Sequence, residues 1–134
     1  MDKMKSLFLL LISVSILSLN ACKKPEGEGG SGRIKGSVKA EQWNATFTVK
    51  QAEFVAMDEW VYIVYGSDIS YGDRIRTNFN GEFEFKYLRA GKYKIYVYSK
   101  DKTLQSASGD VAVIKELTVT EDNTTDAGII TIYK

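Results

Sequence analysis

The 134-residue sequence contains no histidine, and its only cysteine is Cys22. Without histidine there is no imidazole for general acid–base chemistry and no Ser-His or Cys-His nucleophile pair. A single cysteine excludes an internal disulfide, and the two shortages together exclude the usual zinc sites. We therefore expect no catalytic residues, no metal site and no cofactor, which means that the protein is not an enzyme.

Neither sign of charge dominates the sequence. It has 18 Lys and Arg against 17 Asp and Glu, a formal net charge of +1. Nucleic-acid-binding domains carry a clear excess of basic residues, so no nucleic acid is expected as a partner. The length fits one folded domain.

The N-terminus has the pattern of an export signal. Lys3 and Lys5 precede an apolar run from Leu7 to Leu19, which is shorter than the ~20 residues that a membrane-spanning helix needs. A basic start followed by a short apolar run is typical of a signal peptide. An ordinary secretory signal with an unrelated cysteine nearby is one interpretation of the segment.

The residues that follow favour a second interpretation. Leu19, Asn20, Ala21 and Cys22 resemble the lipobox of bacterial lipoproteins, in which the signal peptide is cut off before the cysteine and acyl chains are attached to it. The resemblance implies a removed signal peptide over residues 1–21 and a membrane contact through acyl chains on Cys22. It also implies an outer membrane lipoprotein, on the periplasmic or the cell-surface side.

Glycine and charge dominate the next segment. Residues 22–32 hold four glycines, one proline and several charged side chains, a composition that predicts a flexible linker. Its charge is mixed. The folded domain is then expected to span residues 33–134.

From Arg33 onward, apolar and polar residues alternate with period two, and turn residues recur every eight to twelve positions, which predicts β-strands. The strands are expected at residues 34–39, 61–65, 74–79, 82–87, 92–98, 111–119 and 128–133. About seven short strands in about 100 residues predict an all-β fold, a two-sheet antiparallel sandwich. Residues 40–60 are the least regular, with Phe47 and Val49 expected in a strand.

The alternation also predicts which side chains face the core. One inward set is Phe83, Phe85 and Tyr87, and a second is Tyr93, Ile95 and Val97. Asn80-Gly81 is expected to form a tight turn in which both residues have positive φ. Changes in the alternation predict β-bulges at Lys50-Gln51 and near Lys115.

The segment from Thr77 to Val97 resembles the signature of carboxypeptidase regulatory-like domains, which are transthyretin-like sandwiches. The matching positions are Thr77, Gly81, Phe83, Phe85, Leu88, Gly91 and Tyr93. The resemblance implies that the corner at residues 88–91 crosses from one sheet to the other, so that Phe85 and Tyr93 face each other through the core. It implies no peptidase chemistry. The chain as a whole resembles small lipoproteins of the Bacteroidetes.

Two sets of residues are candidate sites. Tyr96 and Tyr98 face outward and, with Tyr62, could stack on sugar rings as an aromatic platform, although aromatic side chains also pair across strands without binding anything. Asp68 and Asp73 could gather around a cation or form a carboxylate dyad, but such residues are usually solvated turn residues. The sequence therefore predicts a protein–protein interaction or scaffolding module, with glycan binding through the tyrosines as the alternative.

Overall fold

The computed structural model describes residues 1, 3 and 22–134. The predicted lipobox residues Leu19, Asn20 and Ala21, and nearly all of the predicted signal peptide, lie outside the described residues. Within the described part of the chain, no helix is long and apolar enough to cross a membrane.

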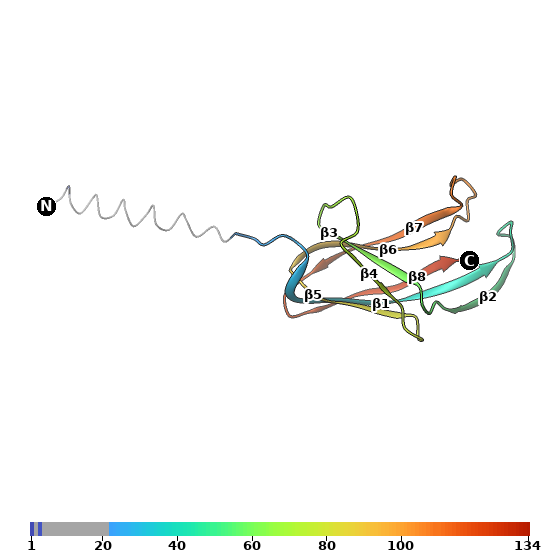
Figure 1. The fold of residues 1–134 in the computed structure, drawn as a ribbon, viewed down its shortest axis with the longest axis horizontal. Helices are drawn as coiled ribbons and strands as arrows, with labels where there is room; N and C mark the ends of the chain where they lie inside the picture. The colour runs from blue at the N-terminus through green and yellow to red at the C-terminus, as the bar shows by residue number, and fades with distance from the viewer. Residues whose placement is uncertain (2, 4–21) are drawn as a thin grey trace.

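Eight strands follow one another along residues 28–133 (Figure 1). They are β1 (Glu28–Trp43), β2 (Lys50–Val55), β3 (Trp60–Tyr65), β4 (Asp73–Arg76), β5 (Glu82–Leu88), β6 (Gly91–Lys100), β7 (Asp110–Val119) and β8 (Thr124–Tyr133). Sheet A contains β1, β2, β5 and β8, and sheet B has the order β4-β3-β6-β7. The predicted all-β, two-sheet fold is confirmed.

The long strand β1 organises sheet A. Its first half pairs with β5 and its second half with β2, both antiparallel. β8 pairs with β1 from Arg33 to Glu41, which overlaps both halves, so β8 must occupy the opposite edge of β1. This pair is parallel, a departure from the predicted antiparallel pairing that places the last strand beside the first.

The core lies between the two sheets and consists of the inward-facing residues of both. Its most deeply buried side chains are Tyr93, Ile34, Ile63, Leu88, Ile95, Ile130, Ile132, Val38, Val61, Val97 and Val119. The inward set predicted on β6 is therefore confirmed. β5 and β6 lie in different sheets, and Phe85 and Tyr93 are both in the core, as the family resemblance implied.

The prediction for Tyr87 is wrong. Phe83 and Phe85 are buried as expected, but Tyr87 is 66% exposed, and Leu88 is buried in its place. The reason is local: Tyr87 has a φ of +60°. This left-handed conformation breaks the alternation of the strand and turns Leu88 toward the core.

The predicted bulges have different outcomes. Near Lys115 there is none, because β6 and β7 pair in unbroken register from Gly91–Val119 to Lys100–Asp110. In β2, Gln42 pairs with Ala52 but Trp43 pairs with Lys50. Gln51 is the extra residue, and the predicted bulge at Lys50-Gln51 is confirmed.

Phe47 and Val49 do not lie in a strand. Residues 44–49 form the turn between β1 and β2. The side-chain carbonyl of Asn44 accepts hydrogen bonds from the backbone N–H groups of Thr48 and Val49, at 2.8 and 3.1 Å. These bonds satisfy backbone groups that a strand ladder would otherwise have to pair.

In the turn before β5, only Gly81 has a positive φ, not the predicted pair. The turn closes through a hydrogen bond from Gly81 N to Asn78 O, and the Asn78 side chain accepts from Asn80 N and Glu82 N. Asn78 therefore supplies the polar partners of this turn.

The predicted flexible linker is shorter than residues 22–32. β1 already begins at Glu28, and Gly27 is buried. The glycines permit close packing: a Cβ added at Gly30 would lie 2.3 Å from Leu88 O, and one added at Gly32 would lie 2.3 Å from a Val119 methyl. These contacts show that the glycines here serve close packing and not flexibility.

Candidate functional site

Four tyrosines gather on the outer face of sheet B, and we call them the tyrosine surface: Tyr62, Tyr71, Tyr96 and Tyr98. Their ring centroids lie 4.8 Å apart for Tyr62–Tyr96, 5.1 Å for Tyr62–Tyr71, and 5.6 Å for both Tyr62–Tyr98 and Tyr96–Tyr98. The structure thus brings together all three residues of the predicted platform and adds Tyr71.

Strand register explains why three of these residues meet. Tyr62 of β3 is the direct cross-strand partner of Tyr96 of β6. Tyr98 follows Tyr96 by two positions and shares its face of the sheet. Tyr71 arrives from the β3–β4 loop, outside any strand, which is why the alternation did not predict it.

The ring geometry determines what the surface presents to a ligand. The planes of Tyr62 and Tyr96 differ by only 5°, so the two rings stack on each other and cover each other's inner faces. Tyr71 and Tyr98 stand edge-on to Tyr62 and are 45% and 51% exposed. The surface therefore presents ring edges and phenol groups more than open ring faces.

Burial raises the pKa of the Tyr96 phenol, and the neighbouring tyrosines, Tyr98 first, add to the effect. Burial favours the uncharged form of such a group. At neutral pH this phenol therefore keeps its proton and can donate a hydrogen bond.

A tryptophan flanked by two arginines extends the tyrosine surface. Trp60 begins β3, and the guanidinium carbons of Arg74 and Arg76 lie 4.2 and 4.3 Å from its ring centroids. Arg76 also forms an ion pair with Asp58 at 2.6 Å. Trp60 has the same parity as Tyr62, so the sequence contained the signal for it, although our prediction omitted it.

A second aromatic cluster lies at the far end of the sandwich from Cys22. Trp43 and Phe47 each pack edge-on against Tyr133, and the Lys102 ammonium lies 4.0 Å from the Trp43 ring centroid. At this distance the Lys102 ammonium forms a cation–π contact with the Trp43 ring.

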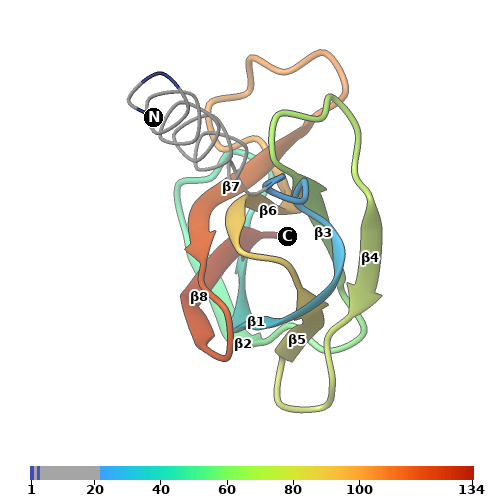
Figure 2. The same ribbon diagram turned by 90° about the vertical axis from the view of Figure 1, so that its left-hand side faces the viewer.

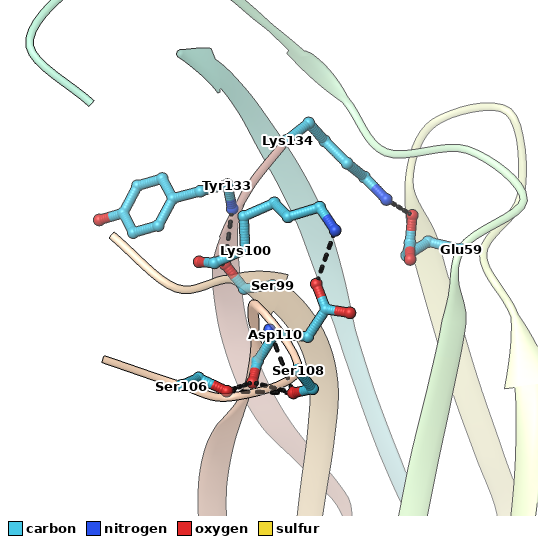
Figure 3. Close-up of polar contacts among 8 residues, drawn as sticks. All are labelled: Glu59, Ser99, Lys100, Ser106, Ser108, Asp110, Tyr133 and Lys134. Carbon is cyan, nitrogen blue, oxygen red and sulfur yellow. Dashed lines mark hydrogen bonds and ion pairs between the residues drawn. The ribbon is translucent and has the colours of Figure 1, made fainter. Parts of the chain in front are cut away.

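Polar contacts tie this end together, as Figure 3 shows. Tyr133 N donates to Ser99 Oγ at 2.8 Å, and the Lys100–Asp110 pair bridges β6 and β7 at 2.9 Å. Lys134 reaches Glu59 at 2.7 Å. The contacts join strand ends and so stabilise this end of the sandwich.

Asp101 organises the loop between β6 and β7. Its carboxylate accepts hydrogen bonds from Thr103 N and Gln105 N at 2.8 Å, and from Ser106 N and Thr103 Oγ1 at 2.6 Å. The bonds from the Thr103 hydroxyl and the Ser106 amide are the main causes that lower the pKa of Asp101 to about 2.

This loop is predicted to lose its order in acid. The folded pKa is lowered from an ordinary value of 3.8 to about 2, so the contribution of Asp101 is complete above the ordinary value and falls as the pH drops through about 2. Amide hydrogen exchange should show the Gln105 and Ser106 amides losing protection in that interval before β6 and β7 do. Asp101→Asn should give the same loss at neutral pH, and unchanged protection in that variant would contradict the assignment.

Of the two acidic candidates, Asp68 belongs to the β3–β4 loop and Asp73 is the first residue of β4. Asp73 Oδ1 accepts a hydrogen bond from the adjacent Arg74 N. In residues 22–134, no three His, Cys, Asp or Glu side chains are grouped so that they could hold a metal ion. A groove of about 790 Å³ borders β5, but charges of both signs line it.

No protein-family model matches the sequence. A search of curated proteins also finds no match.

Three solved structures superpose on this chain with low scores. A proposed carbohydrate-binding protein from Pseudomonas aeruginosa superposes with a TM-score of 0.47 at 15% identity, over 81% of this chain and 91% of that one. A minor pilin from Streptococcus agalactiae gives 0.45 at 13% identity, over 80% of this chain and 46% of the pilin. A 9R-lipoxygenase from Cyanothece gives 0.38 at 15% identity, over 77% of this chain and 16% of the enzyme. At these scores the likenesses carry no inference about function.

Proposed function

We propose that this chain is a lipid-anchored, non-catalytic binding module of the outer membrane, and that its tyrosine surface, extended by Trp60 and Arg74, docks a protein partner. The observation that carries the proposal is the convergence of four tyrosines on the outer face of one sheet. The periplasmic and the cell-surface sides of the membrane both suit such a module.

The residue types of this surface favour a protein partner. Tyrosine, tryptophan and arginine are the residues enriched where protein interfaces carry most of their binding energy. Mutual stacking holds the rings in place before binding, which reduces the entropy that a partner must remove. Because Tyr62 and Tyr96 cover each other's inner faces, the surface suits contacts to ring edges and phenol groups better than stacking on flat sugars.

The anchoring and the lack of catalysis are supported by the sequence. Cys22 follows the apolar segment in a lipobox-like context and is exposed, as acylation requires. The absence of histidine removes the commonest general base.

The proposal is tested by photo-crosslinking in the native cells. Ile114 on β7 is the cross-strand neighbour of Tyr96 and is 54% exposed, while Ile129 on the outer face of sheet A is 62% exposed. A photo-reactive amino acid at position 114 should give one discrete crosslinked protein, and the same residue at position 129 should not. Equal crosslinking from both positions, or none from position 114, would overturn the proposal.

A second candidate is glycan binding by the same surface, favoured by the half-exposed rings of Tyr71 and Tyr98 at its rim. It predicts retarded migration in gels containing a polysaccharide, and loss of the retardation in the Tyr96→Ala, Tyr98→Ala double variant. If no polysaccharide retards the protein, this candidate is wrong.

A further inference from the structure

The segment just after Cys22 is bound to one end of the sandwich rather than extended from it. Gly27 N donates to Tyr93 Oη at 2.9 Å, and Arg89 N donates to Gly27 O at 2.9 Å. Arg89 Nη1 also reaches Pro25 O at 3.3 Å. Figure 2 looks onto this end and shows the blue segment crossing it before β1.

Two further side chains fix the segment. Glu26 lies over Gly91 and Gly66, where an added Cβ would come within 2.3 and 2.8 Å of its side-chain atoms, and its carboxylate accepts from Lys92 N at 3.4 Å. Ser31 Oγ donates to Glu121 at 2.5 Å and accepts from Asp122 N at 2.9 Å. The chain is thus held in place from Pro25 onward.

Only Lys23 and Lys24 lie between the acylation site, Cys22, and the first fixed residue, Pro25, so the two are three residue steps apart. Three residues span at most about 11 Å even when fully extended. A free linker of ten residues would allow the domain to lift and rotate, because its root-mean-square length is roughly 16 to 19 Å. The fixed segment removes that freedom.

We infer that the end of the sandwich formed by residues 25–31, 66–67, 89–92 and 120–122, which we call the anchor end, lies against the lipid headgroups of the membrane. The inference rests on the proposed acylation of Cys22. The opposite end, with residues 44–49 and 101–109, then points away from the bilayer, separated by the ten residues of β6, about 33 Å.

The anchor end carries charges of both signs. Lys23, Lys24 and Lys92 are exposed there, and lysines attract anionic lipid. The carboxylates of Glu26, Glu28, Glu121 and Asp122 lie at the same end, so the inferred orientation rests on the short connection to Cys22 and not on a net charge.

This orientation also determines how a partner approaches. The tyrosine surface lies on a side of the sandwich, with the strands running from the anchor end to the far end (Figure 1). A partner that docks there would lie beside the module at the membrane surface.

The test uses the natively acylated protein in vesicles that contain a lipid with a nitroxide on its headgroup, a quencher that acts only at short range. Two variants carry one fluorescent label each: Ser67→Cys at the anchor end and Ala107→Cys at the far end, both exposed positions. Acylation occupies Cys22, so only the new cysteine reacts. The label at position 67 should lose most of its fluorescence, and the label at position 107 should keep nearly all of it.

A spacer variant is the control. Ten Gly-Ser residues inserted between Lys24 and Pro25 should leave the protein on the vesicles but abolish the quenching at position 67. Equal quenching at both positions in vesicle-bound protein, or full quenching at position 67 in the spacer variant, would overturn the orientation alone. Protein that does not bind the vesicles at all would overturn the proposed anchoring and the orientation with it.

Discussion

Gly81→Ala is expected to lower the free energy of unfolding by about 2–5 kcal/mol. This figure is the sum of two costs: the left-handed backbone conformation of a non-glycine residue, and the loss of a buried backbone hydrogen bond. Gly81 has a φ of +72°. An added Cβ would lie 2.6 Å from Val38 O and 3.3 Å from Ala56 N. These are backbone atoms at the point where β5 and β2 meet along β1, so no side chain can move aside. The Val38 N to Gly81 O bond, 2.7 Å long, would also be strained.

Gly109→Ala is the matched control. Its φ of +76° is nearly the same, but no atom lies within 4 Å of an added Cβ. It should cost only about 1 kcal/mol, since the backbone cost is partly offset by the smaller entropy of the unfolded chain. Urea denaturation of both variants measures the difference, and equal losses of stability would mean that the close packing at Gly81 has no energetic role.

Cys22→Ser is expected to move the protein from the membrane fraction to the soluble fraction. At ~0.8 kcal/mol per buried methylene, two or three acyl chains hold a protein on a bilayer stably, and the loss of the sulfur removes their attachment site. The two lysines after Cys22 contribute only about 1 kcal/mol each near an anionic surface. Fractionation and intact-mass analysis of both proteins measure the effect.

Lys24→Ala is the control for this prediction. It removes one charge beside Cys22 and leaves the acylation motif intact, so it should stay in the membrane fraction. A Cys22→Ser protein that remains membrane-bound with the mass of an unacylated chain would show that another feature holds it there.

Alternation predicted the strands well where each has one buried face. Tyr93, Ile95 and Val97 are buried because every second residue of β6 must enter the core between the sheets. The same rule failed at Tyr87, because a single left-handed residue shifts the parity. The parallel pairing of β8 with β1 depends on contacts between the two ends of the chain, which local patterns do not contain.

The glycines after Cys22 show a different limit. Their composition is the same for a flexible linker and for a segment packed at backbone distance, and only the position of Leu88 and Val119 distinguishes the two. Likewise, parity placed Tyr62, Tyr96 and Tyr98 on one face, whereas Tyr71 joins them through a loop whose path depends on the whole fold.

The most direct test of the tyrosine surface is the affinity of this chain for the protein that crosslinks at position 114. Two variants are compared: the Tyr71→Ala, Tyr98→Ala double variant and Phe79→Ala, which removes an exposed aromatic ring from the β4–β5 turn. Truncation of residues that carry an interface costs about 2 kcal/mol or more, so the double variant should bind at least about tenfold more weakly. Phe79→Ala should bind as the unaltered protein does. Equal affinity of the double variant and Phe79→Ala would contradict the account.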